Sequence, residues 1–242
     1  MQLDLSGNQL CGVDEYGEGT YTAEGITAIA DALRVHGGLT VANLLGNQLD
    51  VKSAKILAEV AKQKGISLCG IQRDQTTADF RKRLQPSDAI LLGSDLSQAV
   101  VTGALTSVDL SYNNLTDYGE NMTGVNELAA ALGVNGALTA LNLSSNRLDD
   151  EGVSAVCKAI QSNKETKLAS LNFENNGIGP VGANAVAAMV AVTGGLTSID
   201  LSGNQLCGIW TDNHGYQGTY TAEGITAIAE ALRVNGALTE VR

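Results

Sequence analysis

Aromatic residues and proline are scarce in this chain. Its 242 residues include two Phe, one Trp, six Tyr and two Pro, whereas hydrophobic residues as a whole reach 44%. This hydrophobic content excludes a compositionally disordered chain. Because the rings are so few, the core must be packed with Leu, Ile, Val and Ala, which is unusual for an enzyme of this size.

Positive charge is also in short supply. Lys and Arg number 15 against 26 Asp and Glu, so the formal net charge is -11. This balance argues against nucleic acid or an anionic membrane as the main partner. The longest uncharged run, residues 175–199, contains Pro180 and Gly194-Gly195 and is cut by a repeat, so we expect no membrane span.

Cysteine is sparse as well. Cys11, Cys69, Cys157 and Cys207 lie far apart, without a CxxC spacing or a neighbouring His. This pattern excludes the common zinc and redox motifs and predicts buried free thiols.

Catalytic motifs are missing from the sequence. His36 and His214 have no motif that supplies a Cys or Ser partner, and neither a Walker A motif nor a GxGxxG motif in a strand–turn–helix context occurs. Asp14, Glu15 and Glu18 share one loop, but they lack the alternating spacing of a calcium loop. We therefore expect no enzyme activity, no cofactor and no metal.

What the chain has instead is an internal repeat. The segment LTSVDLSYNNL of residues 105–115 recurs, with substitutions, at residues 3–10, 39–49, 138–148, 168–178 and 196–206. Each copy is followed by apolar residues at helical spacing. The units 39–66 and 168–195 are each 28 residues long, which predicts a stack of similar strand–helix units.

This pattern resembles the leucine-rich repeat, and its length with a full helix resembles the ribonuclease-inhibitor-like subclass. Similar arrays occur in NOD-like receptors and in Ran GTPase-activating proteins. The resemblance implies an α/β solenoid, or horseshoe, with a parallel β-sheet on the concave face and helices on the convex face. It implies no particular function.

We expect a single solenoid of about seven repeats plus a partial one. The expected units are 1–38, 39–66, 67–104, 105–137, 138–167, 168–195, 196–237 and 238–242. Unit 67–104 is irregular, because Arg83 falls at the Asn position and Leu84 comes one residue early. We predict an extra half-repeat there, then a strand with an atypical turn and a helix from Pro86 to Val101. This joint is similar to joints in leucine-rich arrays of unicellular algae and protists.

The two ends of the chain carry a duplication. Residues 3–12 recur at 199–208 with one substitution, and residues 19–30 recur unchanged at 218–229. His36 aligns with Asn235 in this duplication, which predicts a plain surface residue. Since neither end has a polar capping repeat, we expect an interior slice of a longer array, or ends covered by neighbours in an assembly.

Two polar columns follow from the repeat. Amides that satisfy backbone groups inside the turns are expected at Asn8, Asn47, Asn113, Asn146, Asn176 and Asn204. A second column lies between the last two apolar residues of each strand and is a candidate protein-binding ladder across the concave sheet. Its members are Asp4, Asn43, Asp79, Asp109, Asn142, Asn172 and Asp200, with Tyr112 beside them.

Five of the nine aromatic residues lie in two equivalent Gly-containing loops. These candidate protein-binding residues are Tyr16, Tyr21, Trp210, Tyr216 and Tyr220. Exposed Tyr and Trp on such loops are typical of recognition surfaces. The alternative is that the rings fold back and cover the edge of the solenoid.

Basic residues concentrate in one stretch of the sequence. Eight of the 15 form a candidate basic patch: Lys52, Lys55, Lys62, Lys64, Arg73, Arg81, Lys82 and Arg83. Either they form a solvated helix face or they dock an acidic partner.

These observations favour a non-catalytic scaffold for protein–protein interaction, or an assembly subunit. One alternative, from the resemblance to Ran activators, is a GTPase-activating or regulatory protein. The other is an extracellular or lumenal recognition module, suggested by glycosylation sequons at Asn114, Asn121 and Asn142. Because no signal peptide is visible, we expect an intracellular, cytoplasmic protein, with a lumenal or extracellular location left open.

Overall fold

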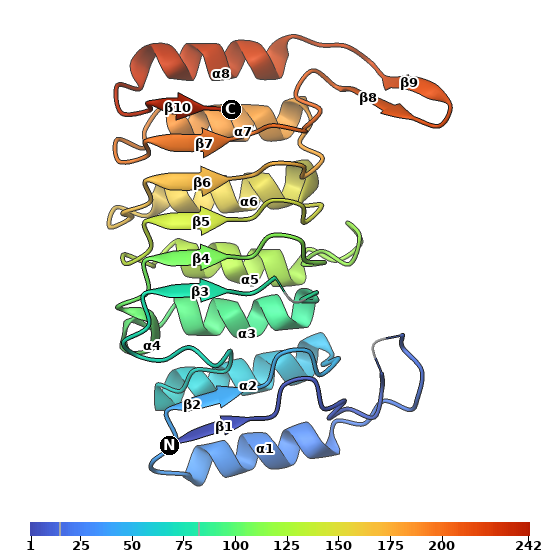
Figure 1. Ribbon diagram of the computed structural model, residues 1–242, viewed down its shortest axis with the longest axis vertical. Coiled ribbons are helices and arrows are strands. Elements are labelled where there is room, and N and C mark those ends of the chain that lie inside the picture. Colours follow the sequence, from blue (N-terminus) through green and yellow to red (C-terminus); the bar gives the residue numbers. More distant parts are fainter. Residues whose placement is uncertain (15, 82) are drawn as a thin grey trace.

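The computed structural model describes residues 1–14, 16–81 and 83–242, and of Asp212 the backbone alone. Short parallel strands stack along one face of the molecule, and helices cover the opposite face (Figure 1). The predicted α/β leucine-rich solenoid is therefore confirmed. In β2 to β7 the middle strand residue is apolar and buried in the core, as in the aligned residues Leu141, Leu171 and Ile199.

The elements alternate along the chain. The strands of the stack are β1 (Gln2–Asp4), β2 (Val41–Asn43), β3 (Thr77–Asp79), β4 (Ser107–Asp109), β5 (Ala140–Asn142), β6 (Ser170–Asn172), β7 (Ser198–Asp200) and β10 (Glu240–Val241). The helices are α1 (Glu24–Val35), α2 (Val51–Lys64), α3 (Pro86–Leu96), α4 (Ala99–Thr102), α5 (Thr123–Leu132), α6 (Asp149–Ser162), α7 (Pro180–Val190) and α8 (Glu223–Val234). An antiparallel hairpin of β8 (Ile209–Asp212) and β9 (Gly215–Gly218) projects from the stack.

The sheet is divided in two. Strands β1 and β2 pair with each other, and β3 to β7 with β10 form a separate sheet of six strands. The segment of residues 66–69 lies between the two sheets. Its Ser67 carbonyl accepts a hydrogen bond from Ala42 N at 2.7 Å, and its Leu68 carbonyl accepts one from Leu44 N at 2.9 Å. This segment is the extra half-repeat, and it separates β2 from β3.

The helix predicted over Pro86 to Val101 is interrupted. Helix α3 ends at Leu96, and α4 begins at Ala99. The reason is local, because the Ser97 hydroxyl and the Gln98 amide both donate to the Ser94 carbonyl at 2.8 and 3.1 Å. Side chains that bond the backbone in this way compete with helix continuation.

The asparagine column closes the turns as expected. Asn176 Nδ2 donates to Phe173 O in its own turn and to Leu143 O in the preceding repeat. The next amide, Asn204, accepts from Asn176 N at 2.9 Å and from Ile178 N at 3.1 Å. Asn47, Asn113, Asn146 and Asn204 likewise donate to a carbonyl of the preceding repeat, so these amides tie neighbouring repeats together. Asn8, in the first repeat, is exposed and donates instead to Ser6 O of its own turn.

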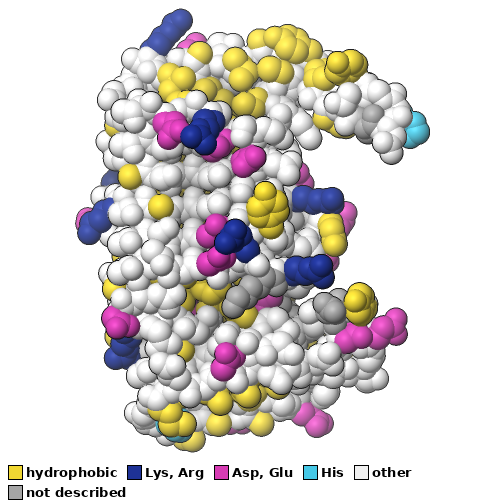
Figure 2. Space-filling model, viewed as in Figure 1, with side chains coloured by type: hydrophobic (Ala, Val, Ile, Leu, Met, Phe, Trp, Pro, Cys, Tyr) yellow, Lys and Arg dark blue, Asp and Glu magenta, His cyan; other side chains and the backbone are white. Residues whose placement is uncertain are grey.

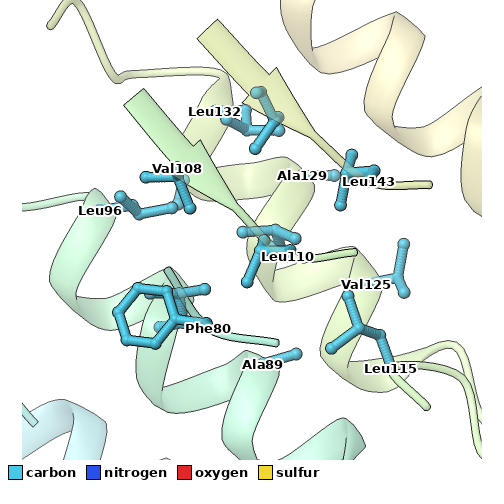
Figure 3. Packing of buried hydrophobic residues seen from close by; sticks show 14 of the residues in the cluster. Phe80, Ala89, Leu96, Val108, Leu110, Leu115, Val125, Ala129, Leu132 and Leu143 are labelled. Carbon is cyan, nitrogen blue, oxygen red and sulfur yellow. The ribbon is translucent and has the colours of Figure 1, made fainter. Parts of the chain in front are cut away.

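Helix α3 is buried along its whole length, because α2 and α5 close over it. Lys55 of α2 and Glu127 of α5 form an ion pair across 3.0 Å. The close approach depends on two glycines. A Cβ at Gly93 would lie 2.8 Å from Glu127 O, and one at Gly124 would lie 2.3 Å from Pro86 O. Figure 3 shows the adjoining core, where Phe80 and Leu110 point between the strands and the helices α3 and α5.

Two carboxylates lie buried in α3. Asp95 accepts hydrogen bonds from Leu68 N, Cys69 N and Ser67 Oγ at 2.8, 3.0 and 2.7 Å, so it holds the half-repeat. Burial raises the pKa of Asp95 to about 6, against the hydrogen bonds that lower it. Burial also raises the pKa of Asp88.

A second capping column lies where the helices end. The Asn135 and Asn235 side-chain oxygens each accept two backbone N–H groups in the following turn. His36 does the same, since its Nδ1 accepts from Gly38 N and Leu39 N at 3.1 and 3.0 Å. His36 is exposed, as predicted for a surface residue, and its imidazole also closes a turn.

The structure also shows the state of the four cysteines. All four cysteines are free thiols; Cys11, Cys69 and Cys157 are buried and Cys207 is half-buried. Burial raises the pKa of the Cys157 thiol.

Across the described part of the chain, every helix is too short or too polar to cross a membrane.

Candidate functional site

The concave column lies in register, but in two parts. Asp4 is aligned with Asn43 in the first sheet. Five further members are aligned in the second sheet: Asp79, Asp109, Asn142, Asn172 and Asp200. The expected single ladder is therefore wrong, because the half-repeat interrupts it.

Each member of this column also closes its own strand. The side-chain oxygen accepts from the backbone N–H two residues later, at distances between 2.7 and 3.4 Å. Arg81 adds an ion pair with Asp79 at 2.5 Å and a longer one with Asp109 at 3.8 Å. The side chains of this column therefore stabilise the turn that follows each strand.

A groove is found where the strands end and the turns begin. We call it the strand-end groove; its volume is about 910 Å³. Turns of the first five repeats line it, with three tyrosines and two arginines among polar amides. The residues with rings or charges are Tyr16, Tyr112, Tyr118, Arg83 and Arg147, and the amides are Gln9, Gln48, Gln85, Asn113 and Asn114.

The rings of this groove are open to solvent. Tyr16 is 82% exposed and Tyr112 70% exposed. The Arg147 guanidinium lies over the Tyr118 ring, 5.0 Å from its centre. Cation–π contact of this kind orients the guanidinium while leaving its N–H groups available. In the sequence, Tyr112 was placed beside the concave column; the structure places it in the groove.

Tyr112 occupies a strained backbone position. Its φ is +58°, in the left-handed region. The equivalent turn positions in other repeats are Gly7, Gly46, Ser145, Asn175 and Gly203, all with positive φ. A bulky residue costs about 1–2 kcal/mol there, whereas glycine does not.

Two arms project from the same edge of the solenoid (Figure 1). The N-terminal arm is residues 13–22 and the C-terminal arm is residues 209–221, which contains the β8–β9 hairpin. Figure 2 shows the surface hollowed between the arms, with hydrophobic and basic side chains on that side. Glu15 of the first arm lies outside the described residues.

The aromatic side chains of the arms behave differently. Tyr216 is 85% exposed, and Tyr16 and Tyr220 are exposed as well. Trp210 packs over Gly218, where a Cβ would lie 2.6 Å from the indole ring. Tyr21 folds back, since its hydroxyl lies 2.7 Å from Ser53 Oγ, and burial raises its pKa to about 12. Both expected outcomes, exposed rings and covering rings, therefore occur.

The basic residues do not gather on one surface. Lys52, Lys55, Lys62 and Lys64 lie on α2, and Arg73 follows the half-repeat and donates to Gly65 O at 3.4 Å. Arg81 is on the strand face, and Arg83 is in the strand-end groove. Lys82 is outside the described residues. A single basic patch was therefore the wrong interpretation, because the chain turns from the helix face to the strand face within this stretch.

The structure also brings together residues that the sequence did not connect. Arg83 and Arg147 come from repeats 64 residues apart and line one groove with Tyr118. The only local signal was Arg83 at an Asn position. Among the described residues, no three His, Cys, Asp or Glu side chains cluster as a metal site would require.

Comparison with known proteins agrees with this geometry. A family model described as leucine-rich repeat matches residues 105–119, 137–157 and 164–187. No curated protein sequence matches the chain.

Two solved structures show a distant likeness. The leucine-rich repeat-containing protein LegL7 from Legionella pneumophila is 19% identical with a TM-score of 0.46, over 100% of this chain and 64% of its own. A structure of the Rad7 and Elc1 complex from yeast is 12% identical with a TM-score of 0.25, over 89% of this chain and 65% of the other. The chain thus spans just under two thirds of either structure. The matched repeats, the parallel strand stack and the asparagine column identify the chain as a leucine-rich repeat protein.

Proposed function

We propose that the chain is a non-catalytic scaffold that binds a protein partner along its strand-end edge, in the hollow between the two arms. Leucine-rich repeats generally mediate protein–protein interaction. The proposal concerns which surface of this solenoid does so.

The gathering of exposed tyrosine, tryptophan and arginine on one edge carries this proposal. Interface hot spots are enriched in these three residue types. They occur in the strand-end groove as Tyr112, Tyr118 and Arg147, and on the arms as Tyr216 and Trp210. A partner that contacts the groove and one arm together would reach several hot-spot residues at once.

The concave face offers less to a partner. Its column residues are engaged in closing their own turns, and the neighbouring positions are small serines such as Ser107 and Ser198. Small polar residues contribute little to binding energy compared with aromatic residues.

Site-specific photo-crosslinking in the cells that make the protein tests this proposal. A photoreactive phenylalanine analogue replaces Tyr112 in the groove or Tyr216 on the arm. The matched control replaces Val192, which is 62% exposed and follows helix α7. We expect the same discrete partner to be captured from Tyr112 and Tyr216 and not from Val192. Capture of no protein at either position, or equal capture at Val192, would contradict the proposal.

A further inference from the structure

We propose that the strand-end groove binds an acidic peptide segment, with carboxylate side chains of the peptide held by Arg83 and Arg147. The inference rests on the proposed function and adds to it the chemistry of the partner. It identifies one groove and two charged residues that no comparison with known proteins assigns.

The charge of the groove is opposite to that of the chain. The protein carries a formal net charge of -11, yet the charged side chains among the described lining residues are both arginines. A guanidinium presents several N–H donors in a planar fork and can bind a carboxylate through two parallel hydrogen bonds. An acidic chain that concentrates two guanidinium groups in one groove is suited to an anionic ligand.

The position of Arg83 follows from a shortened turn. Leu84 N donates to Asn113 Oδ1 at 2.8 Å, as Leu148 N does to Asn176 Oδ1 at 3.2 Å, so Arg83 stands at the turn position that Arg147 occupies two repeats later. Here the turn after β3 is one residue shorter, and Arg83 has a φ of +58°. The buried Asp88 accepts from Gly46 N, a donor that in the regular repeats bonds a backbone carbonyl of the next turn, as Tyr112 N does with Ser144 O. Arg83 and Arg147, with φ of +58° and +52°, thus hold one turn position in repeats that lie two apart, and both line the groove.

The tyrosines favour a peptide over a small inorganic anion. Tyr16, Tyr112 and Tyr118 line the same space as the arginines, and a volume of about 910 Å³ is within the range of well-formed ligand sites. Phenol rings offer both apolar contact and hydroxyl groups to an extended chain. The turn gives this position a positive φ in the other regular repeats too, where Gly7, Gly46 and Gly203 adopt it without strain, whereas Tyr112 places an exposed ring in the groove.

Selection from a phage-displayed library of random dodecapeptides on the full chain tests the proposal. We expect the selected peptides to be enriched in Asp and Glu and to bind in isothermal titration calorimetry. In the double variant R83Q/R147Q we expect affinity for the best peptide to fall by at least about tenfold, as for removal of charged hydrogen-bond partners. The matched control R233Q, on exposed helix α8, should bind like the wild type.

The variant Y112G separates binding from folding. Because other repeats carry glycine here, the variant should unfold at the same temperature as the wild type or higher, and it should still lose peptide affinity. Selected peptides without acidic enrichment, binding unaffected by R83Q/R147Q, or equally tight binding of a twelve-nucleotide oligouridylate would each overturn the proposal. If no peptide binds while Tyr112 still captures a protein by crosslinking, the acidic-peptide assignment fails and the scaffold function stands.

Discussion

Gly46 donates its backbone N–H to the buried carboxylate of Asp88 across 2.8 Å, and this bond connects the turn after β2 with helix α3. The same carboxylate accepts from Gln85 N at 2.9 Å at the start of that helix. Asp88 therefore bridges the break in the sheet, at the place where the regular asparagine is missing.

Replacing Asp88 with Ala should lower the free energy of unfolding by about 2 kcal/mol, because two backbone donors would lose their acceptor. Urea denaturation measures the change. Asp31→Ala on the exposed face of α1 is the matched control and should shift stability by less than about 0.5 kcal/mol. Equal effects of the two variants would show that Asp88 does not support the turn.

The packing of α5 on α3 predicts a strong effect at a glycine. In Gly124→Ala, the new Cβ would overlap Pro86 O, so we expect a loss of about 1–3 kcal/mol of stability and a lower melting temperature. Gly236→Ala serves as the control, since a Cβ there meets no atom within 4 Å. Calorimetric melting temperatures that do not separate the two variants would contradict the packing.

The buried Asp95 makes stability depend on pH. Its pKa is about 6 in the folded protein and 3.8 when unperturbed, so the folded state binds the proton more tightly. The free energy of unfolding should therefore fall as pH rises from about 4 to 6, by about 2–3 kcal/mol from this group.

The variant D95N isolates this contribution. It keeps one acceptor oxygen for the half-repeat but cannot titrate, so its stability should change less than that of the wild type between pH 4 and pH 6. Denaturant titrations at both pH values make the comparison. Parallel pH profiles for the wild type and D95N would exclude Asp95 as the source.

Exchanging His and Asn at the two aligned helix ends should destabilise the protein in one case and not in the other. In Asn235→His the ring can still accept from the following turn, but the Nδ2 donation to Val190 O at 2.7 Å is lost. We expect a loss of about 1 kcal/mol. His36→Asn keeps the acceptor of its turn and should change thermal stability little. A larger loss in His36→Asn than in Asn235→His would contradict this account.

Much of the architecture could be predicted from the sequence, because the repeat fixes the strand–helix period and places an amide at each turn. The irregular unit was visible from Arg83 and Leu84, but its consequences were not. Helix α3 is fully buried because Gly93 and Gly124 allow close contact with backbone atoms of neighbouring repeats. The spacing of apolar residues along one repeat does not reveal such contacts.

The site was less predictable for a related reason. A polar residue on a strand looks available in the sequence, yet Asp109 and Asn142 each bond the backbone two residues later. Conversely, Arg83 and Arg147 share a groove only because the turns after β3, β4 and β5 stack in register. The helix-end column had a signal, the aligned segments VHGGLT and VNGALT, which shows that His36 occupies an asparagine position.

Hydrogen–deuterium exchange of the full chain, with and without the partner captured through Tyr112, tests the recognition surface most directly. We predict slower amide exchange in the turns that contain Arg83, Tyr112 and Arg147, with helices α6 and α7 unchanged. Protection confined to the helix face, or to the strands while these turns exchange as before, would contradict a strand-end recognition surface.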